Sequence, residues 1–102
     1  MPERAILKIG NCVVLDTSLA MKIRDLKKDV YDRVSLAIDG LLLEKDMSEE
    51  DQPVQDLLQL FDETIASINH CRRMEDPTAR RSELRAIREG LPDKISTITA
   101  KA

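Results

Sequence analysis

A chain of 102 residues with 42% hydrophobic residues is long enough for one domain with its own core. Only Tyr31 and Phe61 are aromatic, so aliphatic side chains must fill that core, and pockets or single-strand nucleic-acid sites built on aromatic side chains are disfavoured. The net charge of −3 argues against binding to nucleic acid or to an anionic membrane through bulk charge.

The N-terminal segment contains two apolar runs separated by Gly10-Asn11. This dipeptide suits a two-residue turn that requires positive φ, and the sequence therefore predicts a small β-hairpin over residues 4–16. An isolated hairpin is only marginally stable in water, so we expect it to pack on the rest of the domain or to pair with another chain.

Residues 18–44 carry the strongest periodic pattern and predict a long helix. Ten of the eleven positions on one face are apolar, with Lys27 as the exception. Four further apolar residues, Met21, Leu36, Leu42 and Leu43, lie off this face. They point away from a partner helix in this interpretation, so another element or another chain must cover them.

Two further helices are predicted downstream. The first covers residues 49–75, with Ser48 as its cap and an inward stripe of Val54, Leu57, Leu58, Phe61, Ile65, Ile68 and Cys71. It should pack antiparallel on the helix at 18–44. Asp76-Pro77 then starts a shorter helix over residues 78–89, which Gly90 should end. Residues 92–102 are predicted as a strand, a last helical turn or a tail.

The stretch LKIGNCVVLD, together with YDRVSLAIDGLLLE, resembles the swapped-hairpin AbrB/MazE family of transcriptional regulators and antitoxins. The resemblance covers residues 4–44, and Val34, Leu36 and Ile38 would then alternate along a strand before a turn at Asp39-Gly40. It implies an intertwined dimer that binds DNA through N-terminal loops carrying Lys8 and Asn11. A helix over residues 18–44 and this β arrangement exclude each other, and the helix is the favoured interpretation.

The residues that carry most enzyme chemistry do not form a recognisable pattern. His70 and Cys71 are adjacent, which on a helix separates them by 100°, so they cannot chelate one metal or act as a nucleophile pair. The three glycines are isolated, which leaves no phosphate-binding loop. We therefore expect no catalytic residue, no metal site and no cofactor. The wide spacing of Cys12 and Cys71, with no leader before them, predicts a reduced cytoplasmic protein.

Six arginines fall between Arg72 and Arg88, and Arg81, Arg85 and Arg88 share one face of the third predicted helix. They could bind a phosphate or an acidic partner helix. The favoured interpretation is local pairing with Glu75, Asp76, Glu83 and Glu89, because the same segment supplies these carboxylates.

The sequence thus predicts a single, mainly α domain that acts by protein association, as an adaptor, a chaperone or an inhibitor of a larger partner. The residues expected to bind the partner are Leu36, Leu42, Leu43, Arg81, Arg85 and Arg88. A second copy of the chain is a further candidate partner, and a DNA-binding regulator or antitoxin is the alternative function.

Overall fold

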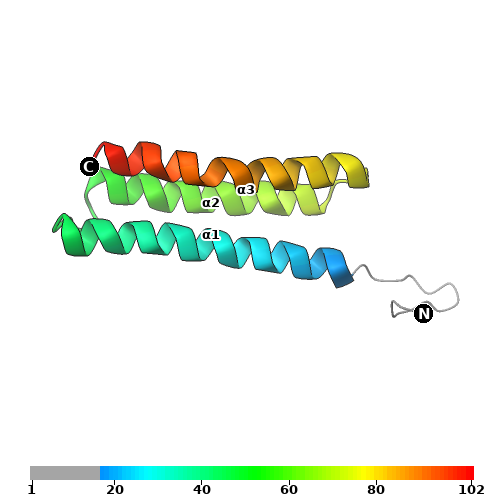
Figure 1. Cartoon of the computed structure of the whole chain (residues 1–102), viewed down its shortest axis with the longest axis horizontal. Helices are drawn as coiled ribbons and strands as arrows, with labels where there is room; N and C mark the ends of the chain where they lie inside the picture. The colour runs from blue at the N-terminus through cyan, green and yellow to red at the C-terminus, as the bar shows by residue number, and fades with distance from the viewer. Residues whose placement is uncertain (1–16) are drawn as a thin grey trace, which may run out of the picture.

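The computed structural model describes residues 17–102, which form a bundle of three helices (Figure 1). These are α1 (Thr17–Glu44), α2 (Gln52–Arg72) and α3 (Pro77–Ala100). The mainly α prediction is confirmed for this part of the chain. α2 runs antiparallel to α1 and packs against both of its neighbours, and α3 returns parallel to α1. The predicted hairpin at residues 4–16 lies outside the described residues.

Helix α1 follows the apolar stripe expected from the sequence. Ile23, Leu26, Val30, Val34 and Leu41 are buried along it. The helix ends where Asp46 adopts a left-handed backbone conformation, with φ of 55°. There the Met47 N–H donates to the Leu41 carbonyl oxygen at 3.1 Å, and the Met47 side chain packs against the core.

The resemblance to the AbrB/MazE family is wrong. It requires an extended segment at Val34–Ile38 and a turn at Asp39-Gly40, and both lie within the uninterrupted helix α1. The continuous apolar stripe explains this outcome, because a helix places these residues along one side whereas a strand would direct every second residue to the opposite face. The DNA-binding alternative depended on this resemblance and is therefore not retained. Lys8 and Asn11, which were its contact residues, lie outside the described part of the chain.

Helix α2 begins at Gln52, three residues after the predicted start. Asp51 is its N-cap residue, and the Asp51 carboxylate accepts a hydrogen bond from the Ser48 N–H at 2.9 Å within the preceding turn. The helix ends at Arg72, three residues before the predicted end.

The buried face of α2 also differs from the predicted stripe. Leu60 and Thr64 are buried, whereas Leu58 is 43% exposed. The shift arises because α2 lies between two helices and must present side chains to both.

Helix α3 begins as predicted, with the Asp76 carboxylate accepting a hydrogen bond from the Thr78 N–H at 3.0 Å. It does not end at Gly90. It continues through Gly90 and Pro92 to Ala100, so the third helix is longer than α2 and residues 92–102 are not a strand. The reason is tertiary packing: Leu91 is only 2% exposed, and Ile95 and Ile98 pack against the core. Burial of this later stripe outweighs the local cost of glycine and proline.

None of the three described helices combines the length and the apolar character needed to cross a membrane.

Candidate functional site: a cationic groove between α1 and α3

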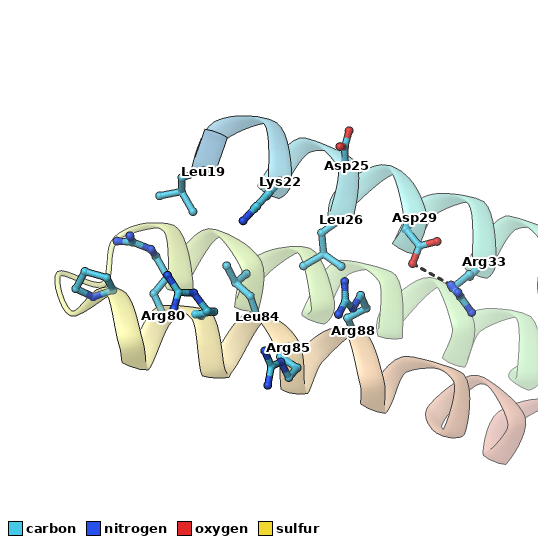
Figure 2. Close-up of a pocket in the computed structure, with 12 residues that line it drawn as sticks. Leu19, Lys22, Asp25, Leu26, Asp29, Arg33, Arg80, Leu84, Arg85 and Arg88 are labelled. Atoms are coloured by element: carbon cyan, nitrogen blue, oxygen red, sulfur yellow. Dashed lines mark hydrogen bonds and ion pairs between the residues drawn. The ribbon is translucent and has the colours of Figure 1, made fainter. Parts of the chain in front are cut away.

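A groove of about 810 Å³ runs between the N-terminal parts of α1 and α3 (Figure 2). Because the two helices are parallel, their N-terminal halves lie at the same end of the bundle (Figure 1). These two segments form the walls of the groove. The lining residues are Leu19, Lys22, Asp25, Leu26, Asp29 and Arg33 on the α1 side and Pro77, Arg80, Arg81, Leu84, Arg85 and Arg88 on the α3 side.

The floor of the groove is apolar. Leu26 from α1 and Leu84 from α3 point toward one another (Figure 2). Leu26 is 9% exposed and belongs to the core, and Leu84 is half-buried against it. The groove is therefore a depression over the hydrophobic core.

The walls are strongly cationic. Six lining residues carry a positive charge and only two, Asp25 and Asp29, carry a negative charge. The groove thus has a local charge opposite in sign to the net charge of −3 of the whole chain. Figure 2 shows Lys22 reaching toward α3 and the Asp25 carboxylate pointing away from it, which makes the interior more positive than the residue count indicates.

Two of the six cations are engaged by groups of the chain itself. Arg33 Nε donates to Asp29 Oδ2 at 2.9 Å along α1. Arg80 is half-buried, and its guanidinium donates to the Met74 carbonyl oxygen at 2.9 Å, which ties α3 to the turn that precedes it. These contacts fix the two side chains at the ends of the groove.

Within residues 17–102, the other arginines of the groove have no carboxylate partner. Among the described residues the ion pairs are Lys28 with Asp32 and Arg33 with Asp29, and neither involves Arg81, Arg85 or Arg88. The expected local pairing with Glu75, Asp76, Glu83 and Glu89 is therefore absent from the described structure. Asp76 instead caps α3. These three exposed guanidinium groups keep all their donors available for a ligand.

The structure separates the predicted binding residues into two places. Arg81, Arg85 and Arg88 lie together on the groove, but Leu36, Leu42 and Leu43 lie beyond it, toward the far end of α1. Leu36 is 73% exposed and Leu43 is 83% exposed, whereas Leu42 packs against the core. A role in partner binding stays a prediction for all six.

The residues on the α1 side of the groove were not predicted from the sequence. Lys22 and Arg33 are eleven residues apart, which is three helical turns, so they share a face with Leu26. The sequence therefore allows the shared face to be inferred. Nothing in the sequence indicated that this face would lie opposite the arginines of α3. The pairing of two parallel helices that are separated by 32 residues of chain is a tertiary property.

The remaining titratable groups give little sign of chemistry. His70 is exposed, and Cys71 is buried, as its place in the predicted inward stripe indicates. Burial raises the pKa of the Cys71 thiol, and the negative charge of Glu83 raises that pKa further. Within residues 17–102, no group of three His, Cys, Asp or Glu side chains is placed to hold a metal ion.

No family model, curated protein or solved structure matches the chain.

Proposed function

We propose that the protein is a non-enzymatic association module that binds an acidic segment of a larger partner protein through the groove between α1 and α3. An adaptor, a chaperone and an inhibitor all work by such association. The observation that supports the proposal is that Arg81, Arg85 and Arg88 line a groove over the core and have no carboxylate partner in the part of the chain that the structure describes.

The energetics favour this proposal. Guanidinium groups form forked hydrogen bonds with carboxylates, and several of them around one groove repel one another until an anionic ligand neutralises them. Binding of an acidic segment therefore gains attraction and relieves repulsion at the same site. Complementary charge also accelerates encounter with the right partner and disfavours wrong ones.

Nucleic acid and small molecules are supported less well by the same groove. None of the twelve lining residues is aromatic, whereas stacking side chains are usual in single-strand nucleic-acid sites and in small-molecule pockets.

The test compares proteins captured from the native host by three immobilised forms of the full chain. The forms are wild type, a groove variant with Arg81→Glu, Arg85→Glu and Arg88→Glu, and a control with Arg24→Glu, Lys45→Glu and Lys101→Glu. The control residues are exposed, lie outside the groove and change the net charge by the same amount. We expect proteins that wild type and control retain and the groove variant loses. Identical captured sets from all three forms would contradict the proposal.

A further inference from the structure

The dimensions of the groove indicate an elongated ligand. The lining residues extend from Leu19 to Arg33 on α1 and from Pro77 to Arg88 on α3. At a rise of 1.5 Å per residue, these segments are about 21 Å and about 16 Å long. Three to four turns of an α-helix have the same length, whereas a single carboxylate or phosphate group would occupy only a small part of it.

The distribution of polarity along the groove indicates an amphipathic ligand. Leu26 and Leu84 form an apolar floor, and Lys22, Arg85 and Arg88 lie along its edges (Figure 2). A helix with an apolar stripe would place that stripe on the floor. Acidic residues on both sides of the stripe would then face the guanidinium groups.

The arrangement of the bundle leaves room for such a helix. α2 packs extensively on both α1 and α3, but α1 and α3 contact each other less extensively. An additional helix along the α1–α3 side would cover the least closed side of the bundle. Four-helix bundles place neighbouring helices about 8–10 Å apart around one core, which is the geometry that this helix would adopt.

We infer that the occupant of the groove is an acidic amphipathic α-helix of the partner protein, about three turns long, which lies along α1 and α3 and completes a four-helix bundle. This inference rests on the proposed function and specifies the structure of its ligand. The helix presents leucine-like side chains to Leu26 and Leu84 and carboxylates to Arg81, Arg85 and Arg88.

Fluorescence anisotropy with three labelled probes tests the inference on the full chain. The first probe is a peptide of about four turns with leucines spaced three and four residues apart and glutamates on either side. The second peptide has the same composition in an order that removes the apolar stripe. The third probe is a DNA oligonucleotide of equal charge.

We expect the amphipathic peptide to bind on the order of tenfold more tightly than the reordered peptide and to gain helical circular dichroism on binding. Its affinity should fall at least about tenfold in the variant with Arg81→Glu, Arg85→Glu and Arg88→Glu, since each attractive pair becomes repulsive. The control with Arg24→Glu, Lys45→Glu and Lys101→Glu should bind as wild type does. A milder variant with glutamine at the same three groove positions repeats the test if the glutamate variant does not fold.

The other outcomes overturn the inference in distinguishable ways. Equal binding of both peptides, still lost in the groove variant, would reject the helical ligand and leave the proposed function standing. Failure of both peptides to bind would reject the inference and the proposed function together. Tighter binding of the oligonucleotide would assign the groove to a phosphate backbone. Concentration-dependent oligomers of wild type that the groove variant does not form would assign it to a second copy of the chain.

Discussion

Arg33 and Asp29 form an ion pair on the α1 wall, with Arg33 Nε 2.9 Å from Asp29 Oδ2, while the arginines on the opposite wall have no carboxylate partner among the described residues. The two walls therefore differ electrostatically although both carry cations. The α1 wall is partly neutralised by its own sequence. The α3 wall keeps its full charge, and the response of the fold to salt depends on this difference.

The first prediction concerns salt. Repulsion among the groove cations destabilises the fold, and salt screens it, since the Debye length falls from about 30 Å at 0.01 M to about 3 Å at 1 M. Added salt should therefore raise the urea midpoint of wild type more than that of a variant with Arg81→Ala, Arg85→Ala and Arg88→Ala. Urea titrations followed by circular dichroism measure both. An equal rise in the two proteins would show that the arginines do not repel one another appreciably.

The second prediction concerns the attachment of α3. Leu91 is 2% exposed and is the one α3 side chain that is fully buried among the described residues. Replacing it with alanine should cost about 2–5 kcal/mol, from lost apolar burial and the remaining cavity. Leu36→Ala removes the same atoms from a side chain that is 73% exposed and should change stability by less than about 0.5 kcal/mol. Similar losses in the two variants would show that α3 is not anchored at Leu91.

The third prediction concerns the buried hydroxyl of Thr64. This side chain is 7% exposed, and its hydroxyl makes no hydrogen bond to another group in the described part of the chain. Thr64→Val should therefore stabilise the protein by about 1 kcal/mol, because a buried polar group without a partner is costly. The matched control is Thr97→Val, since the exposed Thr97 hydroxyl donates to the Asp93 carbonyl oxygen at 2.9 Å. Chemical denaturation should show no gain for the control, and a loss at Thr64 would contradict the prediction.

The fourth prediction concerns alkaline pH. The pKa of the Cys71 thiol is raised from its ordinary value of 9.0, chiefly by burial. Above the ordinary value the unfolded chain releases the thiol proton while the folded chain retains it, so the unfolded state binds fewer protons and stability falls as the pH rises. The contribution of the Cys71 thiol to stability is complete below pH 9. It is lost as the pH rises through the pKa that the thiol has in the folded chain. The urea midpoint of wild type should fall more steeply above pH 9 than that of Cys71→Ala, and parallel curves would contradict this.

The sequence predicts the structure well where a long apolar stripe follows one face of a helix. The stripe from Ile23 to Leu41 predicts α1 within a residue of its observed bounds, because no alternative conformation buries those side chains together. It failed at α3, where Gly90 and Pro92 are strong local stop signals. The burial of Leu91 between them depends on the position of α2, which local signals do not contain.

Only the α3 side of the groove could be predicted from the sequence, because only that side follows from local spacing. Arg81, Arg85 and Arg88 share a helix face, and their common position could be derived from spacing alone. The absence of ion pairs between these arginines and nearby carboxylates in residues 17–102 could not be derived, because it depends on side-chain positions such as that of Asp76, which caps α3. The contribution of Lys22 required knowledge of which helices lie side by side.

The proline inside α3 has a consequence for residues 80–88, the part of α3 that carries the groove arginines. Pro92 has no N–H, so the carbonyl oxygen of Arg88 lacks the amide that would normally bond to it four residues later. The hydrogen-bond ladder is thus interrupted beside the anchor Leu91, and the turns before it are held by half-buried side chains such as Leu84 and Ile87. Amide protons of residues 80–88 should accordingly exchange with deuterated solvent faster than those of the core-facing turns of α2.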